Sequence, residues 1–170
     1  PLCVGIDPEP SALPARFVLV ACSNPCPCGL EPAKCRCSDA ARARYLRRLS
    51  APLLDRFDLR LWINPPRAHE GHGPASAIVR AQVVAAIARQ SDRLAGSPWQ
   101  RNGELPAHAF DAFLPLGSDA LDAWKTICDQ RMLSGRGAAR IRRVARTLAD
   151  LDDRADITPD DLALAAALRE

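Results

Sequence analysis

Four cysteines lie close together in the stretch NPCPCGLEPAKCRC, residues 24–37. They form two pairs with one residue between the partners, Cys26 with Cys28 and Cys35 with Cys37. Clustered thiolates are preferred ligands of Zn²⁺ in its four-coordinate, tetrahedral sites. The two prolines and the glycine near the first pair stiffen the loop and lower the entropy lost on ordering it. The cluster predicts a zinc site; free thiols in a loop or a redox pair are the alternatives.

Asn24 directly precedes this cluster and ends the apolar run ARFVLVACSN, residues 15–24. Open α/β sheets place their ligand-contacting groups at the carboxyl ends of strands. A carboxamide at such a position orients a water molecule or contacts a phosphate. A turn-forming Asn-Pro pair is the simpler alternative, and the residues alone leave both open.

Arg56 stands between two carboxylates, Asp55 and Asp58, in the apolar stretch PLLDRFDL (52–59). One interpretation is a local ion pair with either aspartate. The other is an arginine finger, presented across a subunit interface to stabilise the charge on a transferring phosphoryl group.

A basic stretch, LSGRGAARIRRVARTLADL (133–151), contains Arg136, Arg140 and Arg143 at helical spacing. A solvated basic face over an apolar one accounts for this pattern. The sharper hypothesis places one of these arginines near a nucleotide.

The predicted secondary structure that must position these residues includes strands only in the first part of the chain and is helical in the rest. Continuous apolar runs at 15–24 and 59–63 predict buried strands of a parallel sheet. Capping residues and 3.6-residue periodicity predict helices. Ser38 or Asp39 caps the first of them, Ser134 caps the helix over 134–151, and Thr158 with Pro159 at the first helical position begins the last. The predicted helices span 38–50, 76–94, 118–131, 134–151 and the C-terminal end from 158.

Composition excludes some classes of protein. The net charge of +3 permits nucleic-acid contact without arguing for it. No apolar run approaches the roughly 20 residues of a membrane span, and the first residues lack the pattern of a signal peptide. We therefore expect a cytoplasmic protein without a membrane partner, in which clustered thiols stay reduced and hold metal.

Taken together, these stretches resemble the C-terminal part of the ComM/YifB-type, magnesium-chelatase-like AAA+ ATPases. The resemblance covers about residues 13–170 and rests on four segments in the family's order, with WQRNGELP in the linker between the third and the fourth. The segments are FVLVACSNPCPCG (17–29), CRC (35–37), RYLRRLSAPLLDRFDL (44–59) and LSGRGAARIRRVARTLADL (133–151).

The resemblance implies a fold, an activity and roles for the residues above. The implied fold class is α/β, with the last strands of a P-loop core in residues 1–70, a zinc-binding insertion at 24–38, and an all-helical lid at 71–170. The implied activity is hydrolysis of ATP with Mg²⁺ at the interfaces of a homo-hexamer, driving branch migration on single-stranded or branched DNA in natural transformation. Asn24 and Arg56 take the catalytic roles of sensor 1 and arginine finger, Arg136 is the sensor-2 arginine with Arg143 as the fallback, and zinc binds Cys26, Cys28, Cys35 and Cys37.

Departures from the family pattern limit what this chain does alone. It contains no G-x4-GK[ST] phosphate loop and no acidic tetrad after an apolar strand. We expect these parts upstream of residue 1 in a full-length protein, and no ATP hydrolysis by the chain itself. The alternatives are a magnesium chelatase ATPase subunit, a zinc-containing DNA- or protein-binding module without ATPase activity, and the product of a decayed gene.

Overall fold

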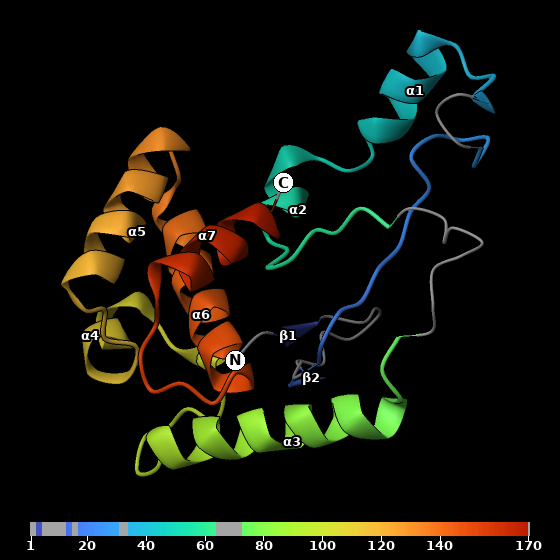
Figure 1. The fold of residues 1–170 in the computed structure, drawn as a ribbon. Coiled ribbons are helices and arrows are strands. Elements are labelled where there is room, and N and C mark those ends of the chain that lie inside the picture. Colours follow the sequence, from blue (N-terminus) through green and yellow to red (C-terminus); the bar gives the residue numbers. More distant parts are fainter. Residues whose placement is uncertain (1–2, 5–12, 15–16, 31–33, 64–72, 170) are drawn as a thin grey trace. The chain divides into compact units, whose positions relative to one another are not determined.

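The computed structural model describes residues 3–4, 13–14, 17–30, 34–63 and 73–169 (Figure 1). The chain divides into two compact units, unit 1 (Pro1–Ser50) and unit 2 (Ala51–Glu170). The cysteine cluster belongs to unit 1, and most of the helices belong to unit 2.

The described residues of unit 1 form a short antiparallel strand pair and one helix. Strand β1 (Cys3–Val4) pairs with β2 (Leu13–Pro14), with Cys3 opposite Pro14. Helix α1 (Asp39–Leu46) begins after Ser38, whose hydroxyl accepts a hydrogen bond from the Ala41 amide at 3.2 Å. The side-chain cap satisfies one of the amide groups that a helix start leaves without a partner. The predicted helix at 38–50 and its Ser38 cap are confirmed, although the helix ends at Leu46.

The predicted α/β fold is wrong for the part of the chain that the structure describes. Neither 17–24 nor 59–63 forms a strand there, and β1–β2 is the only ladder among the described residues. Val20 and Ile63, expected inside a sheet, are 88% and 89% exposed. A continuous apolar run becomes a buried strand only where other strands pair with it, and the described residues provide none beside either run.

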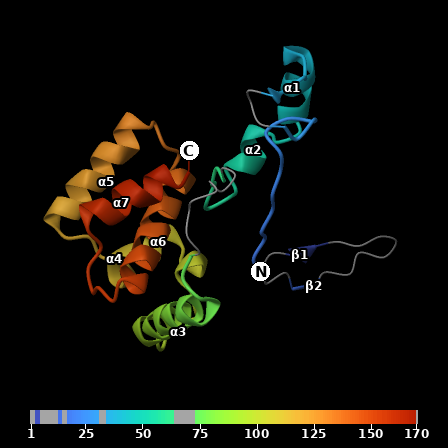
Figure 2. The ribbon, with the colours of Figure 1, turned by 45° about the vertical axis from the view of Figure 1, so that its right-hand side comes forward.

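Unit 2 is helical, with α6 (Gly135–Leu151) at its centre (Figure 2). Helices α3 (Ser76–Arg93) and α7 (Pro159–Ala167) both pack against α6, and α5 (Ser118–Gln130) packs against α7. The remaining elements are short: α2 (Ala51–Leu54), η2 (Asn102–Glu104), η3 (Ala107–Ala109) and α4 (Phe110–Phe113).

Helices α6 and α7 begin at side-chain caps that the sequence predicts. The Ser134 hydroxyl accepts a hydrogen bond from the Gly137 amide at 3.1 Å. Thr158 and Asp161 form a reciprocal capping box, with Pro159 at the first helical position. These starts confirm the predicted helices at 134–151 and at the C-terminal end.

The core of unit 2 lies along one face of α6. Ile141, Ala145 and Ala149 are spaced four apart and fully buried, so they share a face. Small alanine side chains on this face allow α7 to approach closely. Other buried apolar residues of the core are Leu94, Leu105, Phe110, Leu114, Ile157, Leu162 and Ala165.

The described helices include none that is long and apolar enough to cross a membrane.

Candidate functional site

Unit 1 brings the four predicted cysteines together. Their Sγ atoms all lie within 4.8 Å of one another. The Cys26 sulfur is 3.2 Å from that of Cys28 and 3.5 Å from that of Cys35. A tetrahedral zinc site with Zn–S distances near 2.3 Å separates its sulfurs by about 3.8 Å. The donor set and its spacing therefore fit a metal ion such as zinc.

A tight turn sets the geometry of the first cysteine pair. The Gly29 amide donates to the Cys26 carbonyl at 3.1 Å, and Gly29 has a φ of 68°. Glycine adopts this left-handed conformation without the penalty that a side chain brings. A Cβ at position 29 would also lie 3.2 Å from the Asn24 side-chain nitrogen. Asn24, predicted as a water-positioning residue, is exposed and packs beside this turn.

The thiols of the cluster differ in pKa. Backbone amides of Leu30 and Arg36 lower the pKa of Cys28 to about 6. Burial, reinforced by a hydrogen bond to Cys28, raises the pKa of Cys37 to about 11. The pKa of Cys28 therefore lies below those of Cys26 and Cys37, and a cation that bound all four sulfurs would displace protons from the thiols of higher pKa.

Arg56, the predicted arginine finger, lies exposed just after α2. Its guanidinium donates to the Pro52 carbonyl at 2.6 Å. Neither flanking carboxylate is its partner: Asp55 lies 3.5 Å from Arg169, and Asp58 lies 3.2 Å from Arg140. The local ion pair considered as the alternative for Arg56 is therefore not formed.

The two arginines predicted on α6 lie in different environments. Arg136 is exposed in the first turn and pairs with no carboxylate of the described residues. Arg143 is half-buried, donates to the Leu105 carbonyl at 2.9 and 2.6 Å, and lies over the Phe110 ring at 5.4 Å. Burial lowers the pKa of Arg143. Arg143 thus holds the segment before α4 against α6, whereas Arg136 is available to a partner outside unit 2.

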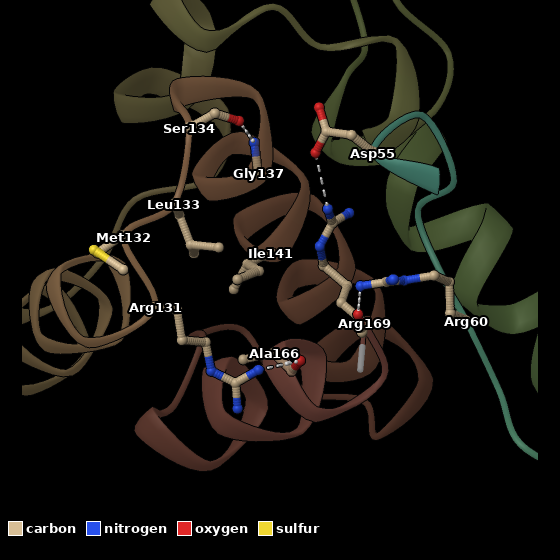
Figure 3. Close-up of a pocket in the computed structure, with 10 residues that line it drawn as sticks. All are labelled: Asp55, Arg60, Arg131, Met132, Leu133, Ser134, Gly137, Ile141, Ala166 and Arg169. Atoms are coloured by element: carbon tan, nitrogen blue, oxygen red, sulfur yellow. Dashed lines mark hydrogen bonds and ion pairs between the residues drawn. The ribbon is translucent and has the colours of Figure 1, made fainter. Parts of the chain in front are cut away.

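A cavity of about 590 Å³ opens beside the start of α6 (Figure 3). It lies between the turn after α5, the end of α7 and the segment that follows α2. Among the predicted site residues, none lines this cavity, although Asp55 adjoins Arg56 and Gly137 adjoins Arg136. The lining residues are Asp55, Arg60, Arg131, Met132, Leu133, Ser134, Gly137, Ile141, Ala166 and Arg169.

Cations outnumber carboxylates on the wall of this cavity, and main-chain oxygens hold them. Arg131 donates to the Ala166 carbonyl at 2.8 Å, and Arg60 donates to the Arg169 carbonyl. Arg169 donates to the Phe57 carbonyl at 3.0 Å, and burial, followed by Arg140, lowers its pKa. Sequence patterns give no sign of these three arginines, because they lie far apart in the chain and match no motif.

Sequence profiles of two related families together match nearly the whole chain. The profile described as "Magnesium chelatase, subunit ChlI C-terminal" matches residues 73–169. The profile described as "Magnesium chelatase, subunit ChlI" matches residues 8–71.

Individual relatives agree with these profiles. The chain is 38% identical over 162 residues to YifB of Escherichia coli (strain K12), covering 92% of this chain and 31% of that protein. It is 35% identical over 164 residues to "Competence protein ComM" of Haemophilus influenzae, covering 92% and 31%. An uncharacterized protein of Mycobacterium tuberculosis is 37% identical over 161 residues, covering 92% and 32%. The chain thus spans about a third of the length of these relatives, and it belongs to the magnesium chelatase subunit ChlI family, with YifB and ComM among its relatives.

Proposed function

We propose that this chain serves in an ATP-hydrolysing AAA+ protein of the ComM/YifB type that remodels DNA as a cytoplasmic homo-hexamer. The observation that carries the proposal is the state of Arg56. Its neighbours Asp55 and Asp58 pair with other arginines, so the exposed guanidinium keeps a charge that no adjacent carboxylate neutralises. That is the condition an arginine needs to act on an anion outside its own unit.

In this proposal, the substrate is ATP with Mg²⁺, which supplies the transferable γ-phosphoryl group. Arg56 donates hydrogen bonds to the nucleotide of a neighbouring subunit and stabilises the charge that develops during transfer. Asn24 orients the attacking water on the subunit's own nucleotide. We place the boundary between the two domains near residue 70, where the two family profiles meet.

The environment of the α6 arginines favours Arg136 over Arg143 as the sensor-2 residue. Arg143 already donates twice to the Leu105 carbonyl, and freeing it would leave that buried oxygen without its partner. Arg136 has no such commitment among the described residues and projects from the first turn of α6. It reaches a nucleotide without disturbing the core.

The cysteine cluster holds a structural zinc ion in this proposal. A short loop with little apolar burial gains stability from a metal whose ligands come from both of its ends. Zinc fixes the turn at Gly29 and the start of α1, and with them the position of Asn24.

The name of the matched family favours a second candidate, the motor subunit of a magnesium chelatase, which shares the ATPase chemistry and differs in the substrate acted upon. Insertion of Mg²⁺ into a porphyrin by an assembled enzyme that contains this chain would support it. ATP hydrolysis stimulated by branched DNA would instead support the ComM/YifB assignment.

A chimaera tests the proposal directly. This chain replaces the matched third of E. coli YifB, and ATP turnover is measured beside unmodified YifB. Arg56→Ala should lower turnover by about 10³-fold or more with nucleotide binding retained, whereas Arg101→Ala, an exposed arginine far along the chain, should leave it unchanged. Full turnover by the Arg56→Ala chimaera, or no turnover by YifB itself, would refute the assignment.

A further inference from the structure

Positive charge is concentrated in one short part of unit 1. Residues 34–48 contain six cations and one carboxylate, a local net charge of +5. The whole chain carries +3, so all other residues together carry −2. The mild overall charge therefore conceals a strongly basic segment, residues 34–48, which includes the second cysteine pair and helix α1.

Three of these arginines lie close together in sequence at the C-terminal end of α1. Arg44 lies in the last turn of α1, Arg47 caps its C-terminus, and Arg48 follows in the turn after it. All three are exposed, and none forms an ion pair with a described residue. The carboxylate of the segment, Asp39, pairs with Arg42, which lies on the other side of the helix.

These arginines do not serve the packing of unit 1. No residue of α1 is buried, so the charged face supports no core. Three like charges this close repel one another, and the carbonyl groups at the helix C-terminus, which favour cations, offset part of that repulsion. An anionic partner would neutralise the remaining charge.

The chemistry of the face favours a nucleic acid over a membrane. A helix that lies on a lipid surface needs an apolar face opposite its charges, and the only large side chains of α1 besides its arginines are Tyr45 and Leu46. Guanidinium groups match phosphate oxygens in charge and in hydrogen-bond geometry. Arg36, exposed between Cys35 and Cys37, adds a further cation just before the helix.

We propose that this surface, formed by Arg44 in the last turn of α1, by Arg47 and Arg48 directly after it, and by Arg36, binds the phosphate backbone of DNA without regard to sequence. The metal-binding loop fixes the start of α1 and so presents the arginines as a group. The proposal rests on the function proposed above, DNA remodelling, and locates a contact with DNA outside the nucleotide site. Its affinity is electrostatic and therefore falls steeply with salt.

The test measures binding of the 170-residue chain to fluorescein-labelled 40-base-pair duplexes of two unrelated sequences, by anisotropy at several salt concentrations and without nucleotide. We expect equal affinity for the two sequences. The triple variant Arg44→Gln/Arg47→Gln/Arg48→Gln should bind at least about tenfold more weakly at low salt. The slope of log K against log salt should fall by about 3.

A charge-matched control removes three exposed cations of unit 2, as Arg80→Gln/Arg101→Gln/Lys125→Gln. It should retain most of the affinity and of the salt slope. Metal content and circular dichroism show whether each variant keeps its fold. Equal loss in both triple variants, or no DNA binding by the unmodified chain, would overturn the proposal.

Two further measurements separate the alternatives. Poly-glutamate or phosphatidylserine vesicles that bind the chain more tightly than DNA does would overturn the proposal in favour of an acidic protein or a lipid surface. Because DNA binding is measured without ATP, the two proposals fail separately. Full turnover by the Arg56→Ala chimaera would refute the proposed ATPase role while leaving the DNA surface standing, and absence of DNA binding would refute the surface while leaving the ATPase role standing.

Discussion

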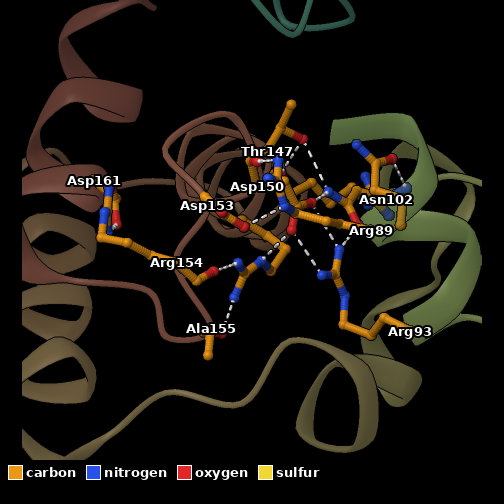
Figure 4. A network of polar contacts seen from close by, with 12 residues as sticks. Arg89, Arg93, Asn102, Thr147, Asp150, Asp153, Arg154, Ala155 and Asp161 are labelled. Carbon is orange, nitrogen blue, oxygen red and sulfur yellow. Dashed lines mark hydrogen bonds and ion pairs between the residues drawn. The ribbon is translucent and has the colours of Figure 1, made fainter. Parts of the chain in front are cut away.

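Arg93 and Asp150 form a bidentate ion pair that joins α3 to α6 in unit 2 (Figure 4). The two guanidinium nitrogens lie 2.7 Å from the two carboxylate oxygens. Asp150 is fully buried and also accepts hydrogen bonds from Asn102 at 2.9 Å and from Arg146 at 3.1 Å. One carboxylate thus links α3, the turn η2 and two turns of α6.

We therefore expect Asp150→Asn to destabilise unit 2 by about 3–5 kcal/mol, because it leaves Arg93 and Arg146 without their compensating charge. Urea unfolding of the 170-residue chain, followed by circular dichroism, measures the change. The control Asp152→Asn removes an exposed pair with Arg154 and should cost less than about 1 kcal/mol. Similar losses in the two variants would show that the buried network does not support the fold.

The capping box of α7 makes stability depend on acid pH. Burial alone would raise the pKa of Asp161, but hydrogen bonds from Arg154 and from the Thr158 amide outweigh it and lower the pKa below 3.8. A carboxyl group with a lowered pKa contributes its stability above the unfolded value and loses it as the pH falls through the folded value. The contribution is complete at pH 7, begins to fall near the unfolded pKa of about 4, and is lost as the pH falls through the lower folded pKa.

Asp161→Asn should accordingly destabilise the chain by about 1–2 kcal/mol at pH 7, the usual cost of losing a helix cap. The difference in unfolding free energy between the variant and the unmodified chain should narrow as the pH falls from 5 to 3. Denaturant unfolding at several pH values measures it. A difference that stays constant over this range would mean that Asp161 does not act as an ionised cap.

Local signals predicted the helices well and the sheet badly. Ser134 and Thr158 mark the starts of α6 and α7 because a cap is a contact among neighbouring residues. A strand has no such local determinant: the run at 17–20 is apolar, but its pairing depends on residues elsewhere. The structure therefore agrees with the sequence where three or four residues decide the outcome and departs from it at Phe17–Val20 and Leu59–Ile63.

The two parts of the candidate site differ in the same way. The four cysteines lie within twelve residues, so the chain itself keeps them close and the cluster is visible in the sequence. The cavity beside α6 was not predictable, because Arg60 and Arg169 are 109 positions apart and meet only when the end of α7 packs against the segment after α2. Arg140 has the spacing of a residue on a solvated helix face, but its side chain is only 14% exposed and pairs with Asp58.

The different surroundings of Arg136 and Arg143 predict opposite effects on substitution. Arg143→Ala should destabilise the chain by about 1–3 kcal/mol, because the buried Leu105 carbonyl loses both hydrogen bonds. Arg136→Ala should leave the unfolding free energy of the chain within about 0.5 kcal/mol, as expected for an exposed side chain. In the YifB chimaera, Arg136→Ala should weaken nucleotide binding or turnover. A chimaera that loses activity only with Arg143→Ala, at unchanged stability, would transfer the sensor role to Arg143.

We expect the cysteine cluster to bind one metal ion, which a measurement of metal content can test. Elemental mass spectrometry of the purified chain should find one zinc per chain, with four thiols protected from alkylation under native conditions. Cys35→Ser/Cys37→Ser should lose the metal, whereas Cys22→Ser, an exposed cysteine outside the cluster, should retain it. Gly29→Ala should weaken metal binding through strain alone, because it removes no ligand but adds a Cβ where φ is 68°. Unchanged zinc in the double variant would refute the assigned ligands, and reactive thiols without metal in the unmodified chain would refute the site itself.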